Sequence, residues 1–493
     1  MHTETLIIGA GPAGLTTAYE LMKHGRSAII VERDPTYVGG ISRTVSYKGY
    51  RFDIGGHRFF SKSAEIEALW TELLGDELLE RPRSSRIYYN GKLFDYPLRA
   101  GDALRKLGIF EALRCVLSYG WAQLTPVRPA KTFEQWVVNN FGRRLFEIFF
   151  KTYTEKVWGM PCSEISADWA AQRIKGLNLF EAIVSSLGLR RKDKDGGVIK
   201  TLIGSFRYPR LGPGQMWERA RDRVVEMGGS VMMGSEIVSL RQHEETKQWV
   251  AIVRDAAGHE TKVTADHVVS TTAMAALVDL VGADTGTGLA NAASNLRYRD
   301  FLTVALIARG KERFDDNWIY IHDPNVKVGR IQNFKSWSPF MVPDPSTACY
   351  GLEYFCFEGD GLWSSSDGDL IALAKAEMSK LGLIVADDVV DGVVIRQPKA
   401  YPVYDDFYRF NVDTIRDELE HSFKNLHLAG RNGMHKYNNQ DHAMMTGLLT
   451  ARNIVKGAGQ FDVWGVNEDA EYHEGAADKP DGRIEERLVP RRA

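Results

Sequence analysis

The stretch TLIIGAGPAG at residues 5–14 joins a short apolar run to three closely spaced glycines. Apolar residues then recur at helical spacing up to Gly25, and a second apolar run, AIIV, is followed by Glu32. A buried strand, a glycine turn, a helix and a second strand ending in an acid form the pattern of a dinucleotide-binding unit. The sequence therefore predicts an α/β fold that contains a doubly wound, Rossmann-like domain.

Each glycine of this turn has a separate physical role. Gly9 permits the tight turn, Gly11 lets the backbone approach a pyrophosphate, and Gly14 lets helix and strand pack closely. The helix N-terminus offers free N–H groups to the phosphates, and Glu32 is placed to accept hydrogen bonds from a ribose. We therefore predict cofactor contacts at these positions: Gly9, Gly11, Ala13, Gly14, Glu32 and Arg33.

Further glycines favour FAD over NAD. Each of them alone is compatible with an ordinary turn. Together they suit a longer ligand that continues past the pyrophosphate, and a helix N-terminus directed at a flavin ring would stabilise its reduced, anionic form. The predicted FAD contacts of this second set are Gly39, Gly40, Arg43, Gly55, Gly56, His57, Gly430, Arg431, Asn439 and Gln440.

Composition excludes several classes of protein. The chain has 493 residues, is 44% hydrophobic and 26% charged, and carries a net charge of −2, so it is an ordinary globular protein without the basic surplus of a nucleic-acid binder. None of the four cysteines forms a C-x-x-C pair, which indicates a reducing, cytoplasmic setting and no bound metal. No signal peptide and no apolar run of membrane-spanning length is visible. The oligomeric state stays open.

The pattern of helices and strands suggests a discontinuous organisation. We expect an FAD-binding domain made of residues 1–90, 201–275 and 401–460. A helical segment at 91–200 and an antiparallel sheet domain at 276–400 would form the substrate side. Within them the sequence predicts long helices at 101–124 and 132–157, a hairpin at 86–96 and a buried strand at 301–308. Residues 465–493 are polar and aperiodic, and we expect a flexible tail.

Five motifs, in the same order along the chain, resemble the UDP-galactopyranose mutases. This family lies within a wider group of FAD enzymes that includes the amine oxidases and protoporphyrinogen oxidases. The motifs are DIGGH at 53–57, YTEKVW at 153–158 with Trp169 and Arg173, FRYP at 206–209, WIY at 318–320 with Arg330 and Asn333, and the segment 430–442.

The resemblance implies a flavin reaction without net redox change. Such a mutase interconverts the pyranose and furanose forms of a nucleotide sugar. Reduced flavin attacks the anomeric carbon, the nucleoside diphosphate leaves, and the sugar opens and recloses within a covalent flavin adduct. The implied cofactor is FAD in its reduced form, with NAD(P)H as a possible reductant, although no second G-x-G-x-x-G supports a site for it.

The resemblance also implies roles for individual residues. Arg173 and Arg330 match two arginines that hold the diphosphate, and His57 matches a histidine over the flavin whose charge could set the glycine loop. Tyr320 and Tyr437 match tyrosines that bond the diphosphate or sugar. Substrate contacts are implied at Trp318, Asn333, Tyr404, Tyr96 and Arg99, although Leu98 and Arg99 depart from the aromatic–glutamine–asparagine pattern of the family.

Other interpretations remain open at this point. An FAD oxidoreductase acting on an amine, a porphyrinogen-like ring or a polyene would need an apolar funnel, for which Phe146, Phe149, Phe150 and Phe180 are available. The pattern favours an ordinary helical core for the same phenylalanines. The arginines are compatible with surface salt bridges, the tryptophan with the core, and the whole chain with a non-catalytic flavin-binding module.

Overall fold

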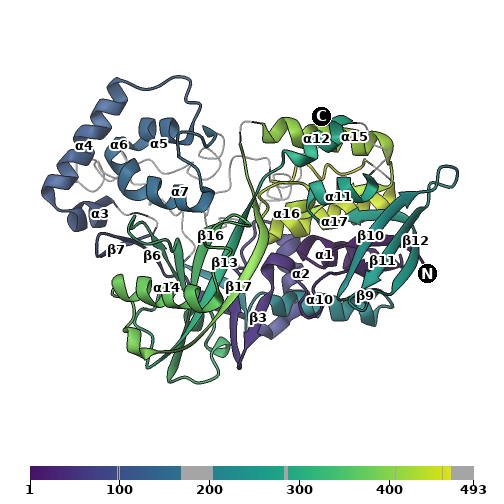
Figure 1. The fold of residues 1–493 in the computed structure, drawn as a ribbon, viewed down its shortest axis with the longest axis horizontal. Helices are drawn as coiled ribbons and strands as arrows, with labels where there is room; N and C mark the ends of the chain where they lie inside the picture. The colour runs from purple at the N-terminus through teal and green to yellow at the C-terminus, as the bar shows by residue number, and fades with distance from the viewer. Residues whose placement is uncertain are drawn as a thin grey trace, which may run out of the picture.

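Two seven-stranded sheets organise the molecule (Figure 1). The computed structural model describes residues 1–96, 98, 100–167, 204–282, 287–405, 407–457 and 459–467. The first sheet has the strand order β10-β11-β12-β1-β2-β9, with β18 paired to β12. These strands are β1 His2–Ile8, β2 Ala28–Val31, β9 Ser230–Met232, β10 Ser235–Gln242, β11 Trp249–Asp255, β12 Glu260–Ser270 and β18 Leu426–Leu428.

The centre of this sheet is parallel and covered on both faces. β1 pairs in parallel with β12 and with β2. Because side chains alternate along a strand, Ile7 packs with α1 Pro12–Lys23 while Leu6 packs against α11 Met274–Val281 on the other face. The predicted doubly wound domain is therefore confirmed.

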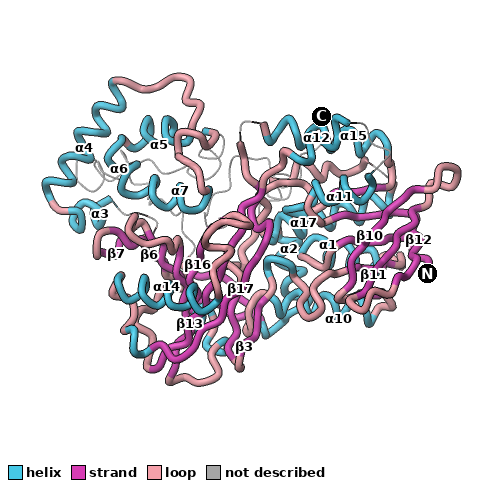
Figure 2. The backbone as a smooth tube through the Cα atoms, in the orientation of Figure 1, coloured by secondary structure: helices cyan, strands magenta, loops and turns pink. Residues whose placement is uncertain are grey.

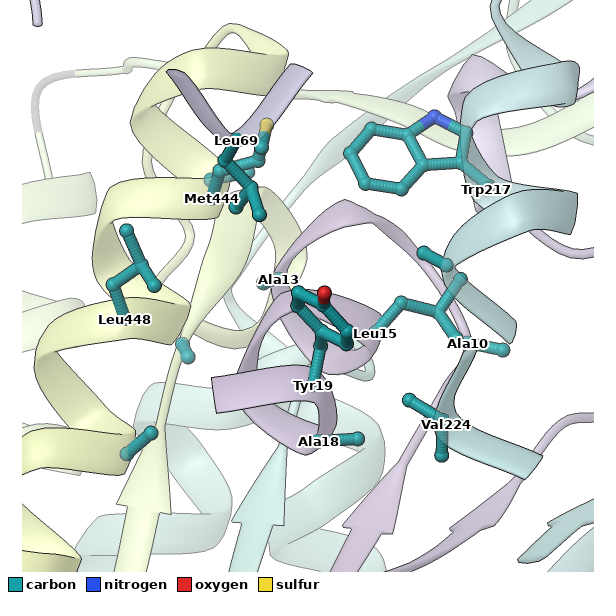
Figure 3. Packing of buried hydrophobic residues seen from close by; sticks show 14 of the residues in the cluster. Ala10, Ala13, Leu15, Ala18, Tyr19, Leu69, Trp217, Val224, Met444 and Leu448 are labelled. Atoms are coloured by element: carbon teal, nitrogen blue, oxygen red, sulfur yellow. The ribbon is translucent and has the colours of Figure 1, made fainter. Parts of the chain in front are cut away.

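Helices from distant parts of the chain close around α1. Figure 3 shows Leu15 and Tyr19 of α1 among Trp217 and Met444, which come from α10 Gly214–Glu226 and α17 Gln440–Lys456. The hydroxyl of Thr17 donates to the carbonyl of Gly447 over 3.3 Å, between residues 430 positions apart. A Cβ on Gly447 would lie 2.5 Å from the carbonyl oxygen of Ala13, so only glycine permits this close helix packing.

The second sheet has the order β17-β13-β16-β15-β14-β6-β7. Its strands are β6 Ser85–Tyr89, β7 Lys92–Asp95, β13 Tyr298–Arg309, β14 Trp318–Ile321, β15 Arg330–Asn333, β16 Thr347–Cys356 and β17 Val389–Pro402. The predicted hairpin is present, with Asn90 and Gly91 both at positive φ. Since β6 pairs with β14, the boundary proposed at residue 90 falls inside this hairpin, and residues 85–95 join the substrate-side sheet.

The helical segment is broken where the sequence predicts continuous helices. It consists of α3 Ala100–Leu107, α4 Ile109–Leu124, α5 Phe133–Phe141, α6 Arg143–Phe146, a π-helical turn Glu147–Lys151 and α7 Thr152–Trp158. The breaks occur at Gly108 and Gly142, whose φ angles of 89° and 81° end a right-handed helix. Figure 2 shows these helices gathered at one end of the molecule, beside the β6–β7 edge.

The remaining described elements are smaller strands, helices and turns. They are β3 Thr44–Tyr47 with β4 Tyr50–Asp53, β5 Leu78–Pro82 with β8 Ser205–Pro209, α2 Ala64–Leu74, α12 Thr287–Ser294, α13 Phe334–Trp337, α14 Asp367–Lys380, α15 Tyr408–Ser422 and α16 Gly430–Gly433, with 3₁₀ turns at Gly40–Ser42, Gly75–Glu77, Pro339–Met341 and Ala386–Asp388. Arg99, Trp169, Arg173, Phe180 and most of the predicted tail lie outside the described residues. Within the described ranges no helix has both the length and the apolarity to cross a bilayer.

Candidate functional site

The glycine turn after β1 forms a cradle with open space in front of it. Gly9, at φ 98°, donates its N–H to the carbonyl of Val31 over 2.9 Å. A Cβ on Gly14 would lie closer than 3.0 Å to the carbonyl oxygen of Gly9, so Gly14 is required by packing. A Cβ on Gly11 would meet no atom within 4 Å, which leaves room beside the start of α1 for a pyrophosphate.

Glu32 and the second glycine pair border this cradle. The Glu32 carboxylate accepts the N–H of Ala10 over 2.7 Å and that of Asp34 over 2.8 Å, and its oxygens retain lone pairs for ribose hydroxyls. Gly39 donates to the carbonyl of Ala10 over 2.8 Å, which ties the second pair to the first turn. Arg33 is exposed at the rim.

Arg43 lies behind the second glycine pair. Its Nη1 donates to the carbonyl of Gly40 over 2.9 Å and to the side chain of Gln397 in β17. Burial lowers the pKa of its guanidinium. Arg43 thereby joins the predicted cofactor loop to the substrate-side sheet.

The C-terminal motif closes the other side of the cradle. Gly430, at φ 80°, donates to Thr446 over 3.0 Å, and a Cβ on it would lie 2.9 Å from the Cβ of Ala13. Gln440 donates to the carbonyl of Arg58 over 3.1 Å, while its Oε1 is buried without a hydrogen-bond partner. An orphaned buried acceptor beside an open cradle fits a ligand that supplies a donor, as FAD does.

The start of α17 differs from the sequence-based interpretation. The sequence suggested that Asp441 caps this helix. Asn439 precedes the helix instead, and its backbone N–H donates to Nδ1 of His442 over 3.3 Å. Asp441 lies inside the first turn, where a carboxylate favours the positive end of the helix dipole.

His57 is held uncharged on the loop that follows β4. Its Nδ1 lies 3.1 Å from the carbonyl oxygen of Gly55, so Nδ1 carries the proton and donates. Burial, assisted by the charges of Arg431 and Arg330, lowers the pKa of His57 to about 3. The suggested change of charge on His57 therefore falls far below neutral pH.

Arg330 forms a buried ion pair and not the surface salt bridge considered for it. Arg330 and Glu353 stand directly opposite each other on β15 and β16. The guanidinium donates from Nε and approaches with Nη2, both at 2.6 Å from Oε2 of Glu353, with side-chain exposures of 16% and 0%. Burial raises the pKa of Glu353, and Arg330 opposes that rise. Glu353 leaves further N–H donors of Arg330 for an anionic ligand.

Tyrosines surround this ion pair. Tyr320 meets the rings of Tyr96 and Tyr153 edge-on, with centroids 5.0 and 5.1 Å away. Tyr437 stacks on Tyr401 at 5.6 Å. Tyr153, Tyr320 and Tyr401 are close enough to Arg330 to raise the pKa of its guanidinium.

Arg431 and Tyr404 hold Tyr437 in place. The guanidinium of Arg431 lies 4.9 Å from the centroid of the Tyr437 ring, within the range of a cation–π interaction. The backbone N–H of Tyr437 donates to the hydroxyl of Tyr404 over 2.6 Å. Tyr404 therefore has a supporting position in the structure.

Two predicted substrate residues lie in the core. Asn333 is fully buried and donates to the carbonyl of Phe314 over 2.7 Å, which fastens the end of β15, while its Oδ1 is buried without a hydrogen-bond partner. Trp318 is buried and stacks on Trp337 at 5.3 Å. The core interpretation, which the sequence left open for Trp318, is the one that the packing favours.

Two important side chains were missed by the sequence reasoning. Glu353 is the lone acid within the apolar strand TACYGLEYFC, and that contrast was the available signal. Lys156 donates to the carbonyls of Ile321, Asp323 and Val328 over 3.3, 2.7 and 3.0 Å, which fastens α7 to the loop between β14 and β15. Burial lowers the pKa of Lys156 to about 8.

The fold and the cradle together are those of a dinucleotide-binding protein in which a second seven-stranded sheet accompanies the doubly wound one. The model of the family described as "Flavin containing amine oxidoreductase" matches residues 12–455, and the chain belongs to this family. The resemblance drawn from the motifs is thereby confirmed at the level of the wider group.

Comparison with individual proteins adds to the family match. The chain is 28% identical over 174 residues to a probable UDP-galactopyranose mutase of Klebsiella pneumoniae, a match covering 33% of this chain and 42% of that protein. The structure of a reduced UDP-galactopyranose mutase superposes with a TM-score of 0.80, at 21% identity, over 96% of this chain and 100% of that one. A putative protoporphyrinogen oxidase from Exiguobacterium sp. 255-15 gives 0.68 at 16% identity, over 92% and 98%.

Proposed function

We propose that the protein is an FAD-dependent sugar-nucleotide mutase that interconverts pyranose and furanose forms without net redox change. The observation that carries this proposal is the buried Arg330 beside the predicted flavin-side loop. A Cβ on Gly55 would lie 3.8 Å from Nη2 of Arg330, and Arg330 contributes to the lowered pKa of His57. Fixed positive charge next to a flavin is what a diphosphate leaving group requires.

The chain's own residues have distinct tasks in such a reaction. Bound reduced FAD supplies a nucleophilic ring nitrogen for attack at an anomeric carbon. Arg330 would bind the diphosphate and stabilise the charge that develops as it leaves, with Arg173 as the proposed second guanidinium. Tyr320 and Tyr437 would donate hydrogen bonds to the diphosphate or sugar, and their rings would exclude water.

Glu353 and Lys156 would act indirectly. Glu353 holds the guanidinium of Arg330 at a fixed angle. Lys156 keeps α7, which carries Tyr153, against the loop that joins β14 and β15. Both are therefore positioning residues, because a diphosphate clamp must not reorganise during the reaction.

The packing of the described phenylalanines gives no support to the apolar funnel that the oxidoreductase interpretation requires. Phe146 and Phe149 are buried within the helical segment, and Phe149 packs edge-on against Phe94 at 5.2 Å. Phe150 stacks on Phe141 at 5.2 Å. These phenylalanines form a helical core, and Tyr320 and Tyr437 pack against the same cluster.

Binding and redox balance test the proposal. Titration of nucleotide sugars into the reduced holoenzyme, followed by flavin absorbance, should show affinity weakened by about 1.5–3 kcal/mol in Arg330→Ala. Arg330→Lys keeps the charge without the bidentate fork, so its affinity for the nucleotide sugar should lie between those of the unmodified protein and Arg330→Ala. Flavin content of each variant controls for folding. Unchanged affinity would remove the diphosphate assignment, and a net transfer of two electrons between substrate and flavin for each product formed would establish an oxidoreductase.

The proposed setting is a reducing cytoplasm with NAD(P)H as the electron donor. All four cysteines are buried and free of disulfides, which supports a reducing compartment. Anaerobic addition of NADH or NADPH to the oxidised protein should bleach the flavin absorbance. If neither NADH nor NADPH bleaches the flavin, NAD(P)H is not the electron donor, and the proposed mutase reaction itself is unaffected.

A further inference from the structure

The outward face of α4 consists of large apolar side chains. Phe110 is 83% exposed and Trp121 is 69% exposed. We call the following set the outer α4 face: Ile109, Phe110, Leu113, Val116, Leu117, Trp121 and Leu124 on α4, and Val127 just beyond its end. Figure 1 shows α4 at the outer edge of the helical segment, away from both sheets.

The distribution of apolar side chains on α4 is the reverse of that on an ordinary surface helix. The inward side of α4 carries the small residues Cys115 and Ala122, which are buried. A helix on the surface of a protein normally turns charged residues to water and its large apolar residues inward. These eight large side chains are between 42% and 83% exposed, and an exposed cluster of large apolar side chains is typical of a binding surface.

The charge around the outer α4 face is positive. Residues 100–131 contain the basic side chains Arg105, Lys106, Arg114, Arg128 and Lys131 and the acidic side chains Asp102 and Glu111. Lys106 pairs with Asp102 over 2.8 Å, and Glu111 pairs with Arg144 and, over 3.5 Å, with Arg114. The segment that carries the patch therefore has more basic than acidic side chains, in a chain whose net charge is −2.

We propose that the outer α4 face attaches the protein to the surface of a bilayer that contains anionic lipid. Helices that lie in the membrane interface combine Trp, Phe and Leu on one side with Lys and Arg at its borders. A second copy paired about a twofold axis would bring the same basic border against itself, which like charges oppose. An anionic bilayer surface would accept the apolar side chains of this face and attract the basic side chains at its border. Such attachment needs no membrane-spanning helix.

Co-sedimentation of the holoenzyme with lipid vesicles tests this attachment. Vesicles of phosphatidylcholine with phosphatidylglycerol should bind the protein, more weakly at high salt, and vesicles of phosphatidylcholine alone should bind it much less. The double variant Phe110→Ser/Trp121→Ser should weaken binding by about tenfold or more. Arg128→Glu/Lys131→Glu should weaken binding to the anionic vesicles and leave the apolar side chains in place.

Phe410→Ser is the matched control. Phe410 lies on α15 and is 72% exposed, so its replacement removes similar apolar surface elsewhere. This control should bind vesicles like the unmodified protein. Equal binding to both vesicle types, or full binding by the double variant, would overturn the attachment. So would light scattering that shows a dimer converted to a monomer by the double variant, because the face would then join two copies.

Discussion

The buried pair of Arg330 and Glu353 makes a strong prediction about stability. Replacing Arg330 by alanine leaves a carboxylate with 0% side-chain exposure without its opposite charge. Breaking a buried ion pair in this way costs about 3–5 kcal/mol. The arginine is only 16% exposed, so solvent screening reduces this figure little. We expect the free energy of unfolding, measured by urea denaturation at pH 7, to fall by that amount.

Two controls isolate the electrostatic cause. Arg254→Ala breaks an exposed pair with Glu260, whose side chains are 45% and 51% exposed, and should cost at most about 1 kcal/mol. The double variant Arg330→Met/Glu353→Leu removes both charges and should recover most of the loss. If Arg330→Ala costs no more than Arg254→Ala, the reasoning from burial is refuted.

The loss in Arg330→Ala should depend on pH with a definite sign. Burial already raises the pKa of Glu353 in the folded protein, and removing Arg330 raises it further. Between the unfolded value, about 4.3, and the raised folded value, the folded state binds more protons, so stability falls as pH rises. The cost measured at pH 7 should therefore shrink as the pH is lowered toward about 4.3. A cost independent of pH would contradict an unpaired carboxylate as its origin.

Three further predictions concern the cradle, His57 and Lys156. Gly11→Ala should keep the stability of the apoprotein within about 1 kcal/mol but lower the flavin content of the purified protein. Gly14→Ala should lower both the flavin content and the stability of the apoprotein. Equal effects of the two substitutions would refute the cradle geometry. Because the pKa of His57 is lowered to about 3, the unfolded state binds the extra proton below about pH 6.5, so stability should fall with acid less steeply in His57→Asn. Because the pKa of Lys156 is lowered to about 8, the unmodified protein should gain stability between about pH 8 and 10.4, and Lys156→Met should lack that gain.

The parts of the fold that were predictable are those specified by neighbouring residues. The spacing of Gly9, Gly11 and Gly14 between an apolar run and a helical pattern predicts their turn, and Asn90-Gly91 specifies its hairpin from two consecutive residues. Both were predicted from a few consecutive residues, and both are present in the structure.

The helix break at Gly142 has a cause outside its own neighbourhood. A Cβ on Gly142 would lie 2.7 Å from the backbone nitrogen of Tyr119, so the break serves the approach of α5 to α4. In the sequence alone, a glycine within a helical pattern is interpreted as a residue that the helix tolerates, because its contact with Tyr119 is not visible there. Continuous helices were therefore predicted where the structure has two.

The candidate site, too, could be predicted from the sequence only in part. Arg330 was singled out by its motif, but its partner Glu353 depends on the register between β15 and β16, which are joined by the long connection at 334–346. Connections of that length do not specify register. Lys156 was likewise quoted only as part of a motif, because its three carbonyl partners belong to another part of the chain.

The contact of Thr17 with Gly447 has a consequence for biosynthesis. One wall of the flavin cradle is translated near the beginning of the chain and the opposite wall 430 residues later. Strands and helices so far apart in sequence assemble slowly, since a large loop must close before they touch. A ribosome-bound fragment that ends before α17 has no complete cradle, so the prosthetic group is loaded at a late stage of maturation, and prematurely terminated chains should purify colourless.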